Sequence, residues 1–436
     1  MRSWIDTGFV QKLLDNNAEL EIFVPREAVE IQKELASKQI AYSKVTLDKN
    51  LLQYFLGRFL WAASMRTSIS LRSRRKQILF GFSQKKGHRG LKKNLIAIAD
   101  ALRVCLGFLL SQPGGWFLAL TGPAFPAFVK RKLTLPVTYS KWEGVVFEKE
   151  ICSSIFLVPT AGYEDWMASF LLRMKSRGIK TVLVPDNWDN LTSKNFLPVE
   201  PDRIVVMGPE SAKNISRELA IPPYKFWPTG LPKFSSIEQN PGRAKRELSD
   251  EVRILFLGFS FPYLEILTLN KLNELLQRNS SRNWLVSYKP HPNRRIGPFK
   301  DQELSFGIEE ITSVSKYELP EIGRGYLEFL KKFDFVIGPP TTMILEFCLS
   351  GYSRVILDLS DDLHYNSTPS MFAKNWTHVA DLEPMNLSIA RTPEEMVELI
   401  EVSLEIRDDP DISKVLAPNP NKYHKELLAK LQDELA

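Results

Sequence analysis

Short apolar runs and longer amphipathic stretches alternate along the first half of the chain, the pattern expected of strand–helix units around a parallel sheet. The apolar runs predict strands at 20–24, 44–47, 154–158, 181–184, 203–207 and 224–229. The amphipathic stretches predict helices at 27–38 and 163–177, and a third that ends at Leu219. Between 50 and 145 this alternation is lost, which indicates an insert.

The alternation starts again after a polar stretch that contains Pro241-Gly242. Strands are predicted at 252–257, 284–288, 333–337 and 355–359, and helices at 263–278, 341–350 and 424–435. Thr392-Pro393-Glu394-Glu395 has the composition of a capping box with proline at the first helical position. A further helix is therefore predicted to begin at Pro393.

These two series predict an α/β protein built from two Rossmann-like domains, whose parallel sheets face each other across a cleft. The N-terminal domain is expected over 1–231 with an insert at about 66–132, the linker over 232–250, and the C-terminal domain over 251–436. The last helix is expected to pack back on the N-terminal domain. Ligands of open parallel sheets bind beyond the carboxyl ends of the strands, so the loops after these strands are where chemistry is expected.

The composition is that of an ordinary folded protein: 436 residues, 44% hydrophobic and 25% charged. Its three cysteines, Cys105, Cys152 and Cys348, are far apart and odd in number. This argues against a disulfide framework and fits a reducing cytoplasm. The first residues lack the long apolar run of a signal peptide, so export is not expected.

Positive charge is concentrated in the insert. Residues 66–132 hold fourteen Lys or Arg and one acidic residue, a local net charge of +13, so the rest carries −7 against +6 for the whole chain. Residues 104–129 contain no charge but several prolines and glycines, which disfavours a membrane span. A basic stretch beside an apolar one fits docking on an anionic membrane surface. The alternative is a buried insert flanked by solvated lysines, and nucleic acid is the poorer interpretation.

The second half contains a strand, a tight Gly338-Pro339-Pro340 loop and a helix that opens with Thr341 and Thr342. Free amides at a helix start, together with two hydroxyls, favour a phosphate. Glu346 lies four residues after Thr342 on the same helix face, where a carboxylate suits ribose hydroxyls. The alternative is an N-cap threonine followed by an ordinary helix glutamate.

Lys289-Pro290-His291-Pro292 directly follows a predicted strand, and Arg294 comes two residues later. Prolines stiffen this loop, and its cationic side chains suit phosphoryl oxygens. Gly258, at the end of another strand, lets backbone approach a ligand. The alternative for the first loop is a solvated turn with a capping histidine.

Taken together, the KPHP loop, the strand–GPPTT–helix segment with Glu346, and Gly351 before a further strand resemble the donor half of GT-B glycosyltransferases. The resemblance covers roughly 154–360 and is strongest to bacterial surface- and capsule-polysaccharide enzymes, including Kdo transferases and CDP-glycerol glycerophosphotransferases. It implies that His291, Thr341 and Thr342 contact donor phosphates and that Glu346 binds the donor ribose. Pro339-Pro340 stands where a Gly-Ser or Ser-Ser pair is usual.

Two polar loops follow strands of the first half and suit sugar hydroxyls: 160–166, with Glu164 and Asp165, and 185–194, with Asp186 and Asp189. Each loop also contains a tryptophan, which suits the apolar face of a sugar ring. An inverting transferase needs a general base near the acceptor hydroxyl, and Asp186 ranks first because it is nearest a strand end. The alternative is that these residues cap the following segment and that Trp188 packs in the core.

The five histidines are scattered, and no Asp or His cluster has metal-ligand spacing. In GT-B enzymes helix amides and cations neutralise the leaving diphosphate, so the resemblance implies a metal-independent enzyme. We expect no cofactor besides the nucleotide-sugar substrate.

The resulting hypothesis is a glycosyltransferase of surface-polysaccharide synthesis that moves a sugar from a nucleotide-activated donor to a lipid-linked or polysaccharide acceptor. It is expected to be cytoplasmic and peripheral at the inner face of the plasma membrane. The alternatives are a polyol-phosphate transferase of the CDP-glycerol type, a sugar-nucleotide epimerase of the same fold, and a non-catalytic membrane scaffold.

Overall fold

The structure of the protein is a computed structural model. It describes residues 4–5, 8–16, 19–26, 28–47, 145–147, 153–158, 166–189, 191–192, 197, 199–234, 250–259, 263–278, 282–291, 303–311, 328–351, 353–361, 368–405 and 423–435. The basic and apolar insert at 66–132, most of the predicted linker, and the site candidates Glu164, Asp165 and Arg294 lie outside these described residues.

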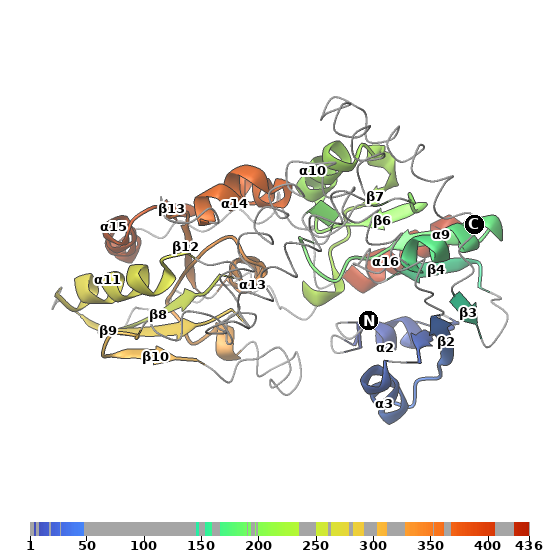
Figure 1. The fold of residues 1–436 in the computed structure, drawn as a ribbon, viewed down its shortest axis with the longest axis horizontal. Helices are drawn as coiled ribbons and strands as arrows, with labels where there is room; N and C mark the ends of the chain where they lie inside the picture. The colour runs from blue at the N-terminus through green and yellow to red at the C-terminus, as the bar shows by residue number, and fades with distance from the viewer. Residues whose placement is uncertain are drawn as a thin grey trace, which may run out of the picture. The chain divides into compact units, whose positions relative to one another are not determined.

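Contacts divide the chain into two compact units (Figure 1). The first comprises Met1–Arg72, Cys105–Ser236 and Leu416–Ala436, and the described part of the second lies within Ile237–Val415. The C-terminal helix α16 (Tyr423–Leu435) therefore belongs to the first unit, although it follows the second in sequence.

Six parallel strands form the sheet of the second unit, in the order β10-β9-β8-β11-β12-β13. Their bounds are β8 (Glu251–Leu257), β9 (Asn283–Lys289), β10 (Ile308–Glu310), β11 (Phe335–Gly338), β12 (Arg354–Asp358) and β13 (Ser388–Ala390). The chain adds strands outward from β8 to β10, returns to the middle at β11 and then continues in the opposite direction. This is the Rossmann order, and its switch point lies between β8 and β11.

The central strands of this sheet are buried on both faces, which explains their almost continuous apolar sequences. Leucines of α11 (Glu265–Arg278) and apolar side chains of α15 (Pro393–Glu405) pack against β8 and β9 in one core. The apolar helix α13 (Thr342–Ser350) packs against β11 and β12. The unit also contains α14 (Pro369–Asn375) and a 3-10 helix over Thr377–Met385.

The first unit contains two sheets. The parallel sheet has the order β4 (Ile155–Val158), β5 (Lys180–Leu183), β6 (Arg203–Val205), β7 (Phe226–Trp227). The other has the order β1 (Phe23–Pro25), β2 (Ser43–Leu47), β3 (Val145–Phe147), of which β3 is antiparallel. Phe23 stacks on Phe156 with ring centroids 6.3 Å apart, so the two sheets share a core. Besides α16, the described α-helices of this unit are α2 (Phe9–Asp15), α3 (Val29–Ser37), α9 (Trp166–Ser176) and α10 (Pro209–Leu219).

Two fully parallel sheets confirm the predicted α/β class, and most predicted elements are present. The strand predicted at 20–24 is displaced to Phe23–Pro25. The strand predicted at 224–229 is reduced to Phe226–Trp227, because Pro222 and Pro223 favour a 3-10 turn over Pro223–Lys225. Gly178 (φ 72°) and Gly351 (φ 69°) end helices in the left-handed conformation.

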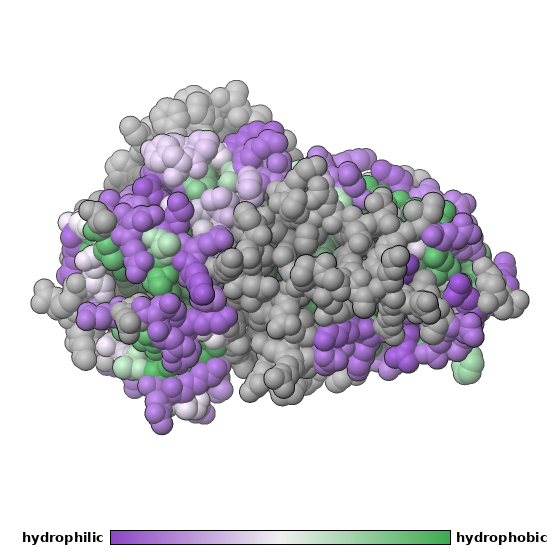
Figure 2. Space-filling view, turned by 180° about the vertical axis from the view of Figure 1, so that it is seen from behind, coloured by the Kyte–Doolittle hydropathy of each residue, from purple (hydrophilic) through white to green (hydrophobic). Residues whose placement is uncertain are grey.

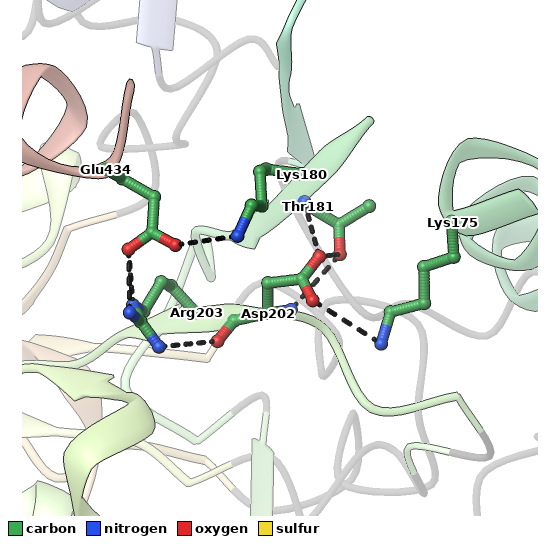
Figure 3. A network of polar contacts seen from close by, with 6 residues as sticks. All are labelled: Lys175, Lys180, Thr181, Asp202, Arg203 and Glu434. Carbon is green, nitrogen blue, oxygen red and sulfur yellow. Dashed lines mark hydrogen bonds and ion pairs between the residues drawn. The ribbon is translucent and has the colours of Figure 1, made fainter. Parts of the chain in front are cut away.

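A polar network fixes the end of α16 to the parallel sheet of the first unit (Figure 3). The Glu434 carboxylate accepts a 2.8 Å hydrogen bond from Nε of Arg203, pairs with Nη2 of the same guanidinium at 2.7 Å and lies 3.5 Å from the ammonium of Lys180. Beside it, Asp202 accepts hydrogen bonds of 2.8 Å from both the amide and the hydroxyl of Thr181. Arg203 and Lys180 open β6 and β5, so Glu434 lies at the amino edge of this sheet.

On the face drawn in Figure 2, the described residues are mainly hydrophilic, and hydrophobic ones occur in small groups. The exposed large hydrophobic side chains come from separate elements, such as Val29 of α3, Leu267 of α11 and Val402 of α15. Among the described residues, no helix combines the length and the hydropathy needed to cross a bilayer.

Replacing Glu434 by alanine is expected to loosen α16. Its carboxylate is 11% exposed and receives charge-assisted hydrogen bonds, each worth about 1.5–3 kcal/mol. Hydrogen exchange of peptides covering α16 should become about 10- to 100-fold faster in Glu434→Ala, because local opening precedes exchange.

Asp433→Ala is the matched control, because it removes the neighbouring carboxylate, which is exposed at the same helix end. Its effect on α16 exchange should stay below the equivalent of about 0.5 kcal/mol. Equal acceleration in both variants would mean that apolar packing alone holds the helix.

Candidate functional site

The carboxyl edge of the six-stranded sheet brings three predicted site segments to one end of the second unit. β8 and β9 pair up to Leu257 and Lys289, and the Gly258 amide donates a 2.8 Å hydrogen bond to the Lys289 carbonyl. β11 pairs with β8 on its other side and ends at Gly338, three residues before Thr341. The loops after β8, β9 and β11 thus meet at the switch point, where sheets of this order bind ligands.

Two glycines make this close meeting of strand ends possible. A Cβ atom on Gly258 would lie 2.8 Å from the amide nitrogen of His291 and 2.8 Å from Oε1 of Glu265. A Cβ atom on Gly338 would lie 2.7 Å from the Cβ of Leu257. Any side chain at either position would therefore push the strand-end loops apart.

Thr341 is the N-cap residue of α13, but its hydroxyl does not cap the helix. Its Oγ1 is buried and has no hydrogen-bond partner within the part of the chain that the structure describes. Two other N-cap threonines of this unit do cap: Thr368 accepts from the amide of Met371 at 3.4 Å, and Thr392 from that of Glu395 at 3.2 Å. The second of these confirms the threonine half of the predicted capping box, whereas the Glu395 carboxylate accepts from the Arg391 amide at 2.6 Å.

Leaving a buried hydroxyl without a partner costs about 1–3 kcal/mol. The first amides of a helix also lack intrahelical partners and form the positive end of its dipole. The amide of Ile344 donates to the Thr341 carbonyl at 3.1 Å. Thr341 therefore places an unused hydroxyl donor beside the amides of Thr342 and Met343, positions that have no intrahelical acceptor. An oxygen of a phosphate group would accept from both.

The other predicted donor-site residues lie on the same edge or one turn below it. Thr342 is half-buried in the first turn of α13, and Glu346, four residues later, is 2% exposed. Lys289 is buried at the end of β9, and His291 is half-buried two residues further on. The edge thus holds a cation, an imidazole and hydroxyls, whereas the position of Arg294 is outside the described residues.

Sequence reasoning missed Glu265, which is fully buried at the start of α11. Its carboxylate accepts hydrogen bonds from the Phe259 amide, at 2.9 Å, and from the Tyr288 hydroxyl. Glu265 therefore ties the Gly258 loop to the end of β9. A glutamate in the first turn of an amphipathic helix looks ordinary in sequence; only its lack of exposure in the fold distinguishes it.

Asp358, at the end of β12, is a second buried carboxylate on this edge that sequence reasoning missed. It accepts hydrogen bonds from the Tyr263 hydroxyl at 2.9 Å and from the Ser360 amide at 2.8 Å. Burial raises the pKa of Asp358 from its ordinary value of 3.8; the charge of Glu265 acts in the same direction, and the hydrogen bonds oppose it. The two carboxylates are thus electrostatically coupled.

In the first unit, Asp186 follows the end of β5, where the Val184 amide donates a 2.8 Å hydrogen bond to the Val158 carbonyl of β4. Asp186 and Asp189 are both half-buried. Trp188 between them is only 3% exposed, so its ring packs in the interior. This corrects the expectation that this loop offers an aromatic face to a sugar. Glu164 and Asp165 stay predictions outside the described residues.

Among the described residues, no group of three or more His, Cys, Asp or Glu side chains is arranged to hold a metal ion.

No protein-family model and no curated protein matches this sequence. Among solved structures, the chain is similar to a UDP-GlcNAc 2-epimerase from Neisseria meningitidis bound to UDP-GlcNAc (12% identity, 95% of this chain and 100% of that chain, TM-score 0.43). It is also similar to S. aureus MnaA with UDP (12% identity, 65% and 76%, TM-score 0.42). A variant of the wall teichoic acid polymerase TagF is a further match (11% identity, 59% and 69%, TM-score 0.38). Because these TM-scores are below 0.5, the function proposed below rests on the residues of this chain alone.

The raised pKa of Asp358 predicts a pH-dependent stability difference between wild type and Asp358→Asn. A folded-state pKa above the unfolded value gives a contribution that is fully present below the unfolded pKa, about 3.9, and is lost as pH rises through the folded pKa. The asparagine variant should therefore gain stability relative to wild type as pH rises from about 3.5. Each unit by which the pKa of Asp358 differs between the folded and unfolded states changes the free energy of unfolding by about 1.4 kcal/mol. Urea unfolding of both proteins at several pH values measures this difference.

Asp202→Asn is the control with the opposite sign. Burial raises the pKa of Asp202, but hydrogen bonds from Thr181 and the charges of Lys175 and Lys180 outweigh burial and lower it. Its contribution is present above the unfolded pKa and is lost as pH falls, so Asp202→Asn should lose stability relative to wild type as pH rises. If the stability relative to wild type changed with pH in the same direction for both variants, this electrostatic description would be wrong.

Proposed function

We propose that the chain is a glycosyltransferase that uses a nucleotide-activated sugar as donor, and that the donor phosphates bind at the start of α13. The observation that carries the proposal is the buried hydroxyl of Thr341, which has no partner among the described residues and lies at the start of a helix at the sheet's switch point. Each of these features favours an anion, and only together do they define where its oxygens lie.

The remaining residues of the edge take roles that follow from their chemistry. Thr342 and the α13 amides bind phosphoryl oxygens together with Thr341. Lys289, His291 and Arg294 stabilise the negative charge that develops on the departing phosphate. Glu346, one turn below, accepts hydrogen bonds from ribose hydroxyls. Helix amides and cations replace a metal ion in this proposal.

The acceptor is proposed to bind the first unit, with Asp186 as the general base and Asp189, Asp165 and Glu164 as the other candidates. The base takes the proton of an acceptor hydroxyl, whose oxygen attacks the anomeric carbon of the donor sugar. The bond from that carbon to the phosphate oxygen breaks, and the nucleotide leaves with the electron pair. A lipid-linked or polysaccharide acceptor fits the proposal that residues 66–132 contact an anionic membrane surface.

Thermal-shift screening against CMP-, CDP-, UDP- and GDP-linked sugars, with EDTA present, tests the donor site. A ligand that binds only the folded chain raises its melting temperature. Product analysis by NMR with the best donor then separates the hypotheses: a new glycosidic bond or sugar hydrolysis indicates a glycosyltransferase, transfer of a polyol phosphate indicates the CDP-glycerol type, and a changed sugar configuration indicates an epimerase. No shift with any donor would contradict nucleotide binding.

Thr341→Val is expected to weaken nucleotide binding without lowering stability. Valine keeps the shape and β-branching of threonine but removes the hydroxyl, which makes no hydrogen bond within the described residues. A hydrogen bond to a neutral ligand atom contributes about 1 kcal/mol, so its loss reduces affinity about fivefold. A hydrogen bond to a charged group contributes about 1.5–3 kcal/mol, so its loss reduces affinity about tenfold or more. Isothermal titration with the best nucleotide measures this.

Thr392→Val is the matched control, for which the opposite pair of results is expected. Its hydroxyl caps α15, so the substitution should lower the free energy of unfolding by about 1 kcal/mol and leave nucleotide affinity unchanged. If both variants lower stability and neither changes affinity, Thr341 is an ordinary helix cap and the proposed phosphate site is wrong.

A further inference from the structure

Glu265, the first residue of α11, places a carboxylate behind the loops of the proposed donor site. It is fully buried, so it does not reach a ligand itself. Its Oε2 accepts a 2.9 Å hydrogen bond from the Phe259 amide, and its Oε1 accepts one from the Tyr288 hydroxyl. An apolar side chain could fill the same space, so what distinguishes a carboxylate at this position is the pair of segments that it connects.

The contacts around Gly258 show how close this carboxylate lies to the His291 turn. A Cβ atom on Gly258 would lie 2.8 Å from Oε1 of Glu265, 2.8 Å from the amide nitrogen of His291 and 3.0 Å from the Cα of Pro290. The carboxylate and the backbone of the turn therefore border one space that is too small for a methyl group. Movement of the Glu265 side chain would change the support of the turn directly.

Both hydrogen bonds attach Glu265 to segments that lead into proposed site residues. Tyr288 directly precedes Lys289 at the end of β9, and His291 follows two residues later. Phe259 lies in the loop after β8, on the neighbouring strand. Hydrogen bonds are directional, so two bonds to one carboxylate fix the loops after β8 and β9 relative to each other.

The same sheet edge contains a chemically similar pair that connects other segments. Asp358 accepts a 2.9 Å hydrogen bond from the Tyr263 hydroxyl and a 2.8 Å one from the Ser360 amide. Both Asp358 and Tyr263 are buried, and the Tyr263 ring packs edge-on against Phe259 with centroids 6.2 Å apart. This pair joins the start of α11 to the end of β12, and neither segment carries a residue of the proposed donor site.

We infer that Glu265 is a positioning residue of the donor site. Through the Tyr288 hydroxyl and the Phe259 amide it holds the turn that carries Lys289 and His291 in the geometry that binds a phosphate group. The inference rests on the proposed function, of which it identifies a residue that acts behind the ligand-binding side chains. We assign the role to the two hydrogen bonds and not to the negative charge, because a negative charge near a phosphate is repulsive.

Tyr288→Phe and Tyr263→Phe form a matched pair for the test. Each keeps its ring and removes a hydroxyl that donates to a buried carboxylate, so both should lower the urea midpoint of the full chain by a similar amount. The binding probes are CMP, CDP, UDP and GDP, titrated calorimetrically. Tyr288→Phe should bind the best of them about tenfold more weakly than wild type, and Tyr263→Phe should bind it equally well.

The imidazole of His291 provides a readout that does not need a ligand. Its nitrogen and proton signals in two-dimensional NMR report the surroundings of the ring, and His291→Gln identifies them among the five histidines. These signals should shift in Tyr288→Phe and stay in place in Tyr263→Phe. A purely stabilising role of the two tyrosines would give the same spectrum in both variants.

Glu265→Gln and Glu265→Met separate the hydrogen bonds from the charge, because both side chains are neutral and similar in size. The glutamine carbonyl can accept from the Phe259 amide, and its amino group can donate to the Tyr288 oxygen, since a hydroxyl accepts as well as donates. Methionine makes neither bond. Glu265→Met should therefore lose about tenfold in nucleotide affinity and shift the His291 signals, and Glu265→Gln should restore both.

The inference and the proposed function fail in different ways. If Tyr288→Phe and Glu265→Met bind the nucleotide as tightly as wild type, or if Glu265→Gln loses as much affinity as Glu265→Met, the inference is overturned and the donor site stands. If no nucleotide binds the wild type, the donor site fails. The His291 signals then decide alone: a shift confined to Tyr288→Phe supports the positioning role, and equal spectra of the two tyrosine variants overturn it.

Discussion

The geometry of the second unit depends on the contact between the ends of β8 and β11. Strands in a sheet lie about 4.8 Å apart, and the loops that leave two neighbouring strands need room for their first side chains. Here that room is absent, since a Cβ on Gly338 would overlap Leu257 and a Cβ on Gly258 would overlap the His291 loop. The absence of two side chains therefore lets the start of α13 lie beside the β8 and β9 loops. Larger residues at these positions would separate the groups proposed to share one phosphate.

Glu265 and Asp358 show how the same edge is kept rigid. Two carboxylates without exposure are unfavourable unless each is hydrogen-bonded. Each accepts from two hydrogen-bond donors in different segments. For Glu265 these are the Gly258 loop and β9, and for Asp358 they are Tyr263, just before α11, and Ser360, just after β12. Apolar side chains at these two positions could also be buried, but they would form no hydrogen bonds between these segments. We attribute the network to loop geometry rather than to overall stability.

Periodicity was sufficient for the parts of the fold where burial repeats along the chain, such as β8, β9 and α11. It failed for Ile308–Glu310 and Ser388–Ala390, because short strands at a sheet's edge carry few buried side chains and leave little pattern. At the site, motif spacing was enough to select Thr341, since proline and glycine mark the turn before it. Glu265 and Asp358 could not be selected, because what distinguishes them is burial in the fold and contact with residues far away in sequence, such as Tyr288 and Tyr263 respectively. For Trp188 the low exposure favours the alternative kept open from the sequence, that its ring packs in the core.

The buried hydroxyl of Thr341 has no partner among the described residues, which distinguishes it from most buried polar groups there. Thr181, which is 0% exposed, bonds Asp202 through both its amide and its hydroxyl, and the Ser353 hydroxyl donates to the Phe333 carbonyl at 2.7 Å. Those groups are satisfied by the fold and need no ligand. An unpaired buried hydroxyl lowers the stability of the free protein, and natural sequences keep such local conflicts mainly where function requires them. Among the described residues the hydroxyls of Ser360 in the second unit and Thr229 in the first are unpaired as well, so an unpaired hydroxyl is not specific by itself. That of Thr341 indicates a ligand because it also lies at the start of a helix and at the switch point of a parallel sheet.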